Sequence, residues 1–140
     1  MAKVAVTVKF AKPAREVWAI IGGFLTIGEW NPGVAKCTPK FEGNDIIRHL
    51  ELADGGYVVE PLLYYDAAGM EYAYAITEGT LPFRDYVARL RVLEDDNGAS
   101  CIVQWTASFT PTADEAEVVD LVANGVFRAS LNALKERLGA

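Results

Sequence analysis

The sequence contains one histidine and two cysteines, too few to supply the nitrogen and sulfur ligands of a usual zinc site. Its 13 Lys and Arg residues are outnumbered by 19 Asp and Glu residues, and the net charge of −6 argues against a nucleic-acid partner. No uncharged apolar run is long enough to cross a bilayer, and the N-terminus lacks the unbroken apolar segment of a secretory signal. These absences predict a protein without a metal ion, a nucleic-acid partner or a membrane span.

The chain is rich in apolar and aromatic residues. With 140 residues, of which 51% are hydrophobic, it is long enough to bury a sizeable core. No repeat, linker or low-complexity tract interrupts it, so we expect one domain over residues 1–140. Cys37 and Cys101 carry no sign of an oxidising compartment, which favours two free thiols and a cytoplasmic location.

The order of the expected elements defines a fold class. Alternating apolar residues predict a first strand over residues 4–10, two short helices follow up to Trp30, and a long helix covers residues 114–138. Between the helices, turn signals separate six further strands: 34–41, 46–52, 56–66, 70–77, 83–94 and 99–110. The short links imply an α+β fold in which a curved, seven-stranded antiparallel sheet wraps around the long C-terminal helix.

Loop lengths assign side chains to the two faces of this sheet. A three-residue loop over residues 53–55, with Gly55 at its end, sets Arg48 directly opposite Glu60. A second three-residue loop, 67–69, pairs Tyr64 with Tyr72 by the same argument.

A five-residue turn over residues 78–82 then brings Tyr74 opposite Tyr86. All these residues fall on the inner face, and the last strand adds Trp105 and Phe109 to it.

An arginine and a carboxylate on an apolar face have two interpretations. The pair can be a buried salt bridge that fixes strand register. Four nearby tyrosine hydroxyls also need hydrogen-bond partners, which a cavity filled by a ligand or water satisfies more easily than a dry core. We therefore favour a cavity. His49 is out of phase with Arg48 and is expected to face solvent, and Cys101 is expected to fill core space.

The chain resembles the helix-grip superfamily called START-like or Bet v 1-like, and within it the polyketide cyclase/dehydrase group. The resemblance covers nearly all 140 residues and rests on the order of several short motifs. They are V-W-A-I-I-G-G-F at 17–24, W-N-P at 30–32, E-G at 42–43, Y-A-Y at 72–74, L-P-F-R-D-Y-V at 81–87 and W-T-A-S-F at 105–109.

Within that group the chain is similar to a branch that includes bacterial proteins and the plant lachrymatory-factor synthases, which need no cofactor. That branch has an Arg on the third strand, a Glu in an E-x-L stretch on the fourth and a Tyr in S-Y-V on the sixth. Arg48, Glu60 and Tyr86 occupy these places here, although Asp85 stands where the pattern has Ser. The resemblance implies that these three residues are catalytic, while the substrate does not carry over.

The sequence thus predicts that the protein binds a small hydrophobic or aromatic molecule and performs cofactor-free acid/base chemistry of the cyclase, dehydratase or isomerase type. Glu60 is expected to be the acid or base, Arg48 to hold an anion and Tyr86 to donate a hydrogen bond. A non-enzymatic carrier of a lipid or small metabolite is the alternative, and the chain is expected to be a monomer or homodimer. The residues expected to bind the molecule are Trp30, Leu62, Tyr64, Tyr72, Tyr74, Trp105, Phe109 and Phe127.

Overall fold

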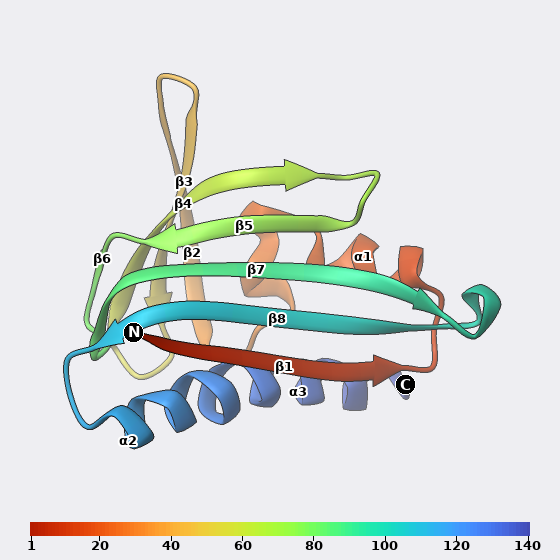
Figure 1. Ribbon diagram of the computed structural model, residues 1–140. Helices are drawn as coiled ribbons and strands as arrows, with labels where there is room; N and C mark the ends of the chain where they lie inside the picture. The colour runs from red at the N-terminus through yellow and green to blue at the C-terminus, as the bar shows by residue number, and fades with distance from the viewer.

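The computed structural model describes all residues 1–140 and contains one antiparallel sheet, in the order β1-β8-β7-β5-β4-β3-β2, with the short β6 paired to β4 (Figure 1). The α+β helix-grip fold expected from the sequence is confirmed. The strands are β1 (Ala2–Phe10), β2 (Val34–Glu42), β3 (Asp45–Leu52), β4 (Tyr57–Asp66), β5 (Glu71–Ile76), β6 (Glu78–Gly79), β7 (Phe83–Asp95) and β8 (Ser100–Pro111).

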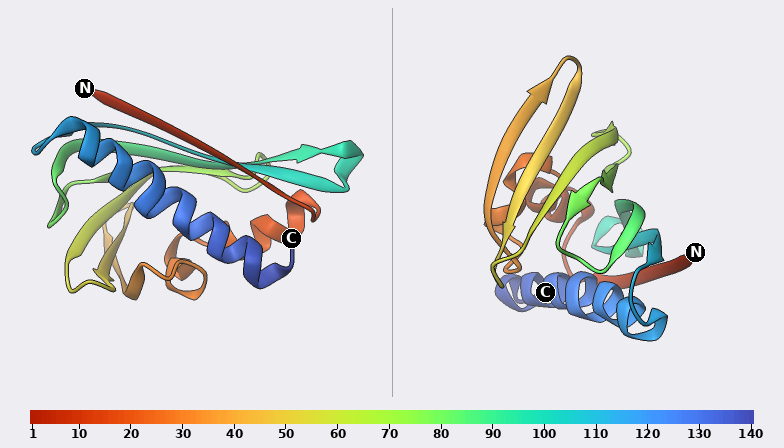
Figure 2. Two further views of the ribbon diagram at one scale, coloured as in Figure 1. Left: turned by 90° about the horizontal axis from the view of Figure 1, so that it is seen from below. Right: turned by 90° about the vertical axis from the view of Figure 1, so that its left-hand side faces the viewer.

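Helical segments cover the concave side of the sheet. After β1 come α1 (Ala14–Ile21) and the 3-10 helix η1 (Phe24–Glu29), and a 3-10 turn η2 (Asp96–Gly98) links β7 to β8. The C-terminal helix consists of α2 (Glu115–Asp120), a π-helical stretch η3 (Leu121–Arg128) and α3 (Ala129–Leu138). It runs as one long rod across the concave face, as Figure 2 shows.

Capping residues explain where the C-terminal helix begins and ends. The Asp114 carboxylate accepts a hydrogen bond from the backbone N–H of Glu117 at 3.1 Å, which satisfies one of the free donors of the first turn. At the other end Gly139 adopts a left-handed conformation with φ of 65°, which costs glycine little.

The core lies between this helix and the inner face of the sheet. The inward residues of β8 are buried as expected, and among them the Trp105 ring stacks on Phe127 of the helix with 4.2 Å between centroids. Cys101 is one of these core residues, and both cysteines are free. Alternation of apolar residues along the strands therefore identifies the core face correctly.

The predicted register of the third and fourth strands is confirmed. Arg48 lies opposite Glu60 and Leu50 opposite Val58 in the β3–β4 pair. Gly55 at the end of the connecting loop has φ of +95°, a left-handed conformation that glycine adopts at low cost.

The predicted inward position of Tyr64 is wrong. Asp66 pairs with Glu71, so the loop has four residues, and Met70 takes a left-handed φ of 52°. An irregularity between Leu62 and Tyr64 adds one residue to β4, which turns Tyr64 outward, where it is 48% exposed. Tyr65 stands opposite Tyr72 instead.

The predicted pairing of Tyr74 with Tyr86 is shifted by two residues. Tyr74 lies opposite Ala88, and Tyr86 lies opposite Ile76. A two-residue shift preserves the face, so both tyrosines still point inward and are buried. Directly before Tyr86, Asp85 has φ of 54° at a bulge in the β7–β8 pairing.

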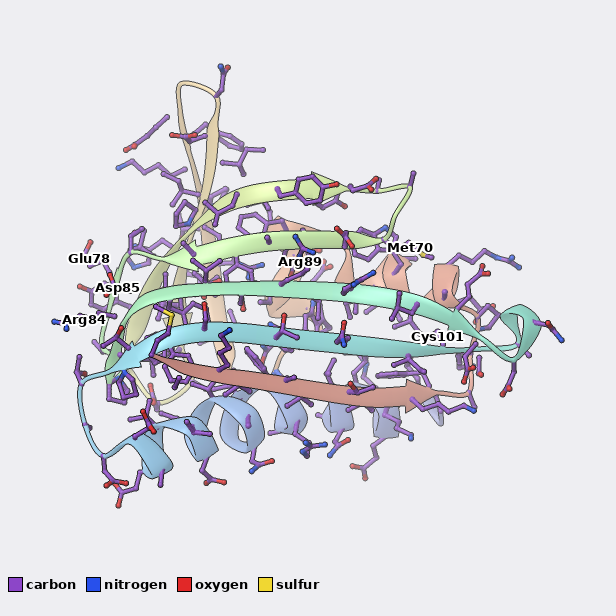
Figure 3. The ribbon with its side chains drawn as sticks, viewed as in Figure 1. Met70, Glu78, Arg84, Asp85, Arg89 and Cys101 are labelled. Atoms are coloured by element: carbon purple, nitrogen blue, oxygen red, sulfur yellow. The ribbon has the colours of Figure 1, made fainter.

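The outer face of the sheet carries charged side chains, of which Arg89 on β7 is labelled in Figure 3. Arg89 and Arg91 lie 4.0 and 3.4 Å from the Glu71 carboxylate. His49 is exposed, as expected, and its ring stacks on Tyr57 at 5.4 Å. None of the helices has the length and apolar character that crossing a membrane requires.

Candidate functional site

A cavity of about 410 Å³ lies between the sheet and the C-terminal helix. This volume is within the range of small-molecule binding sites. Most of its lining is apolar, and the inner wall is formed by buried residues of the sheet and helix, which include Leu50, Val58, Tyr74, Tyr86, Trp105, Val122 and Phe127.

The mouth of the cavity can be located from the exposed residues among its lining. They belong to three segments: Pro32 and Gly33 before β2, Ala53 and Asp54 between β3 and β4, and Gly125 and Ala129 on the C-terminal helix. A hydrogen bond from the Ala53 N–H to the Gly33 carbonyl, 2.9 Å long, holds the first two segments together. The opening therefore lies between these two loops and the helix.

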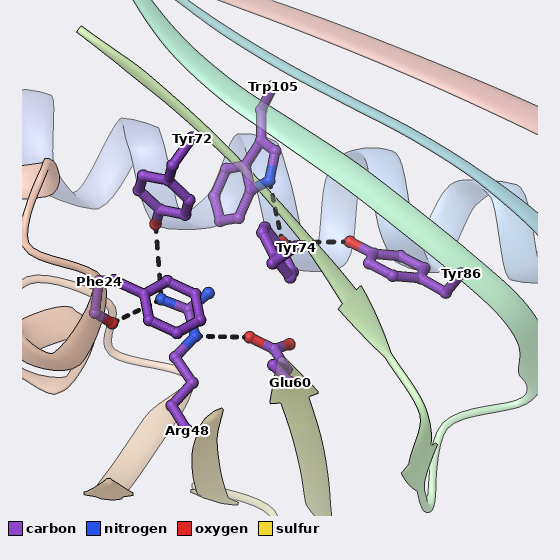
Figure 4. A network of polar contacts seen from close by, with 7 residues as sticks. All are labelled: Phe24, Arg48, Glu60, Tyr72, Tyr74, Tyr86 and Trp105. Carbon is purple, nitrogen blue, oxygen red and sulfur yellow. Dashed lines mark hydrogen bonds and ion pairs between the residues drawn. The ribbon is translucent and has the colours of Figure 1, made fainter. Parts of the chain in front are cut away.

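Glu60 is the one buried carboxylate in the wall of this cavity, where it is 5% exposed. Its Oε1 accepts a hydrogen bond from Arg48 Nε at 2.7 Å (Figure 4). The other carboxylate oxygen, Oε2, accepts no hydrogen bond within the protein, and it is not among the polar atoms that are fully enclosed without a partner. Glu60 thus presents an unshared oxygen at an apolar surface.

Arg48 is fully buried and is held from several sides. Its Nη1 donates to the Phe24 carbonyl oxygen at 2.8 Å and lies 3.5 Å from the Tyr72 hydroxyl. The guanidinium also lies over the Phe24 ring, 4.0 Å from its centroid, and 4.8 Å from the centroid of Tyr74. The η1 segment and β5 therefore fix the position of this side chain.

Arg48 itself does not line the cavity. Two of its three nitrogens are engaged by the protein, and Nη2 is enclosed without a partner. The geometry therefore places Arg48 behind Glu60 as its support, whereas the sequence led us to expect Arg48 to hold an anion in the cavity.

Burial and the charge of the partner shift the pKa values of Arg48 and Glu60 in opposite directions. Burial raises the pKa of the Glu60 carboxyl above its usual value, and the Arg48 charge offsets only part of that rise. Burial lowers the pKa of Arg48, but the Glu60 charge and the nearby tyrosines more than reverse this, so its pKa is raised. Arg48 is therefore always charged, whereas Glu60 can exchange a proton closer to neutral pH.

Three aromatic side chains form a second polar group in the inner wall. Trp105 Nε1 donates to the Tyr74 hydroxyl at 3.1 Å, and the Tyr74 and Tyr86 hydroxyls lie 3.3 Å apart (Figure 4). Because the indole N–H can only donate, it occupies one lone pair of Tyr74. When Tyr74 donates onward to Tyr86, the proton of Tyr86 remains free for a molecule in the cavity.

The tyrosine hydroxyls remain protonated across the physiological range. Burial raises the pKa of Tyr74 and Tyr86, the neighbouring hydroxyl adds to the rise at Tyr86, and Glu60 raises both. They are therefore hydrogen-bond donors rather than bases.

The structure brings some of the predicted binding residues together and separates others. Tyr74, Trp105 and Phe127 line the cavity with Glu60 and Tyr86. The remainder do not line it: Tyr72, Phe109 and Trp30 are buried in the core, Leu62 is partly buried, and Tyr64 faces outward.

Sequence reasoning missed two polar residues of the wall, Asn31 and Ser130. They are 5% and 4% exposed and lie 3.0 Å apart through their side-chain oxygens. The only signal available was Asn31 in the W-N-P motif, since Ser130 looks like an ordinary helix residue. No group of three or more His, Cys, Asp or Glu side chains is placed to hold a metal ion.

A curved sheet closed by one long helix over an apolar cavity defines a helix-grip protein of the ligand-binding type. The sequence matches the family described as polyketide cyclase / dehydrase and lipid transport over residues 1–139, and the chain belongs to that family. A comparison with curated protein sequences gives no match.

Solved structures agree with this assignment. The protein XoxI from Bacillus cereus has a TM-score of 0.91 at 26% identity, covering 98% of this chain and 95% of the other. A protein from Thermobifida fusca has a TM-score of 0.86 at 31% identity, covering 99% and 94%. The Zhui aromatase/cyclase from Streptomyces sp. R1128 shares the fold, with a TM-score of 0.75 at 19% identity and coverage of 99% and 92%.

Proposed function

We propose that the protein binds a small, largely apolar or aromatic molecule in the cavity and catalyses cofactor-free proton transfer on it. The reaction class is a cyclisation, dehydration or isomerisation. The observation that carries the proposal is Glu60, a buried carboxylate with one unshared oxygen in the wall of an apolar cavity. Membership of the cyclase, dehydrase and lipid-transport family and the shared fold of an aromatase/cyclase support it.

In this proposal Glu60 removes a proton from a carbon next to a carbonyl group. The electron pair of the broken C–H bond moves onto the carbonyl oxygen, and the Tyr86 hydroxyl donates a hydrogen bond to that oxygen. Glu60 then returns the proton to a different atom or to the leaving oxygen. The raised pKa of Glu60 suits this exchange, because a base with a pKa nearer the working pH transfers protons in both directions.

Arg48 has the role of a positioning residue. It binds Glu60 Oε1 at 2.7 Å, which leaves Oε2 free for the molecule in the cavity, and its charge stabilises the ionised carboxylate. The role of anion holder, expected from the sequence, passes to Tyr86, whose hydroxyl lies in the cavity wall.

A carrier of a lipid or small metabolite is the second candidate. The lipid transport in the family description and the mostly apolar lining favour it. A carrier needs no acid/base residue. Replacing Glu60 should therefore abolish proton transfer in an enzyme but leave transport by a carrier intact.

The test follows deuterium exchange from heavy water into the methyl group of acetylnaphthalene by proton NMR. We expect the wild type to accelerate the exchange and Glu60→Gln to lose about 10² to 10⁴ of the acceleration. Glutamine keeps the shape of the side chain and can still accept from Arg48. Glu51→Gln is the matched control, because Glu51 is an exposed carboxylate on β3.

Exchange that survives in Glu60→Gln removes the acid/base role. Binding of acetylnaphthalene by the wild type without any exchange supports the carrier instead.

A further inference from the structure

The polar side chains of the cavity fall into two groups. Glu60, Tyr74 and Tyr86 belong to the buried inner wall. Asn31 and Ser130 belong to the mouth, because the exposed Pro32 directly follows Asn31 and the exposed Ala129 directly precedes Ser130.

The carboxamide of Asn31 has a single possible orientation. The backbone N–H of Gly33 lies 2.9 Å from Asn31 Oδ1, and since an N–H can only donate, that position must be the oxygen. The Ser130 hydroxyl, on the C-terminal helix, lies 3.0 Å from the same oxygen, and its single proton is shared between that oxygen and the Val126 carbonyl oxygen 2.5 Å away. Two segments 99 residues apart therefore fix this side chain.

The orientation leaves Asn31 Nδ2 without a partner. No protein acceptor lies within hydrogen-bond range of it, although the residue is only 5% exposed. Nδ2 is not one of the fully enclosed polar atoms without a partner, so it is accessible, and a ligand oxygen or water can accept its hydrogen bond. Asn31 is thus a preorganised donor in the cavity wall.

A shallow recess of about 220 Å³ on the surface, lined by Leu134 and Arg137 among others, also touches Asn31. Asn31 therefore borders both hollows. Of the two, only the cavity of about 410 Å³ has the size and the mostly apolar lining of a small-molecule site, so we assign the free donor to it.

We propose that Asn31 is a second ligand-binding residue, whose Nδ2 donates to a carbonyl or hydroxyl oxygen of the molecule at the mouth of the cavity. The ligand class is then an aromatic or alicyclic compound with two oxygen functions. One lies at the inner end near Glu60 and Tyr86, and the other lies at the opposite end near Asn31. This inference rests on the proposed cavity and adds the specificity of its outer end.

Two probes differ only in the group at one end. The diacetyl probe is a naphthalene with an acetyl group at each end, and in the acetyl-ethyl probe one acetyl group is replaced by ethyl. We expect Asn31→Asp to lower the preference for the diacetyl probe by about tenfold, because aspartate keeps the shape and both acceptor contacts but loses the donor. Asn132→Asp, an exposed change on α3, is the control and should leave the preference unchanged.

NMR of the wild type gives a readout that does not depend on any variant folding. Both probes should shift the indole N–H signal of Trp105, which lies in the inner wall. Only the diacetyl probe should shift the side-chain amide signal of Asn31.

An equal preference in the wild type and Asn31→Asp overturns the inference, as does an Asn31 amide signal that stays still while Trp105 shifts. Neither result affects the exchange assay with Glu60→Gln, so the two proposals fail separately. If neither probe moves the Trp105 signal, the cavity does not take such ligands and both proposals fall.

Discussion

Replacing Arg48 with methionine tests the structural role of the Arg48–Glu60 pair. Methionine has a similar length and fills the space between the Phe24 and Tyr74 rings, so packing changes little. What it removes is the 2.7 Å bond to Glu60 and the 2.8 Å bond to the Phe24 carbonyl. Glu60 is then a buried carboxylate without a partner.

Breaking a buried ion pair by removing one partner costs about 3 to 5 kcal/mol. At about 2 to 4 °C per kcal/mol for a domain of this size, the melting temperature should fall by roughly 6 to 20 °C at neutral pH. The loss of stability in Arg48→Met must also depend on pH. Without Arg48 the pKa of Glu60 rises further in the folded state, so the protonated form is favoured there.

A carboxyl whose folded pKa is raised contributes stability below its unfolded pKa and loses it as pH rises through the folded pKa. The stability lost in Arg48→Met should therefore be smallest at pH 4, where the missing bond to the Phe24 carbonyl remains the main cost, and should grow toward pH 8. Urea denaturation at several pH values, followed by Trp fluorescence, measures it. Arg89→Met is the control, because Arg89 is an exposed arginine of the outer face and should cost at most about 1 kcal/mol.

The double variant Arg48→Met/Glu60→Leu should regain most of the lost stability, since an apolar pair removes the uncompensated charge. If Arg48→Met loses no more stability than Arg89→Met, or loses the same amount at every pH from 4 to 8, then Arg48 does not stabilise an ionised Glu60.

Three further changes test the wall, the mouth and the strand bulge. Tyr86→Phe should lower the exchange rate of acetylnaphthalene by about 10²-fold while costing only about 1 kcal/mol in a thermal melt; unchanged exchange would remove Tyr86 from the reaction. Gly125→Leu should weaken acetylnaphthalene binding about tenfold in a calorimetric titration, because a side chain enters the mouth; full affinity would place the opening elsewhere. Asp85→Gly should raise the free energy of unfolding by about 1 kcal/mol, since glycine relieves the left-handed φ of 54°; a loss would show that the Asp85 side chain supports the bulge.

Much of the inner face could be predicted from alternation and loop length. The loop that ends at Gly55 determines a two-strand register, and this is enough to place Arg48 opposite Glu60. The inward position predicted for Tyr86 is correct although its pairing is shifted by two residues, because an even shift keeps a side chain on the same face of the sheet.

The outward position of Tyr64 and the role of Asn31 in the cavity wall could not be predicted from alternation and loop length. A longer loop at Met70 and an extra residue near Leu62 compensate each other, so Leu62 keeps its partner Tyr74 while Tyr64 changes face. No local sequence pattern predicts a bulge of this kind. Asn31 depends on a contact with Ser130, and a pair so distant in sequence leaves no periodic signal.

The position of Arg48 behind Glu60 also depends on a contact between residues distant in sequence. Its guanidinium is drawn away from the cavity by the carbonyl of Phe24, which belongs to a 3-10 segment on the other side of the site. Face assignment states which side of the sheet a residue occupies, but not how far along that side a long side chain reaches.

The proposed function requires Glu60 to be an ionisable carboxylate in contact with the molecule that the cavity binds. Carbon-13 NMR of the Glu60 carboxyl between pH 4 and 8, with and without acetylnaphthalene, measures this directly. The proposed function predicts a midpoint above the ordinary value of 4.5 in the free protein, and a further rise on binding because the ligand displaces water from the carboxylate. A midpoint at the ordinary value that binding leaves unchanged would contradict it.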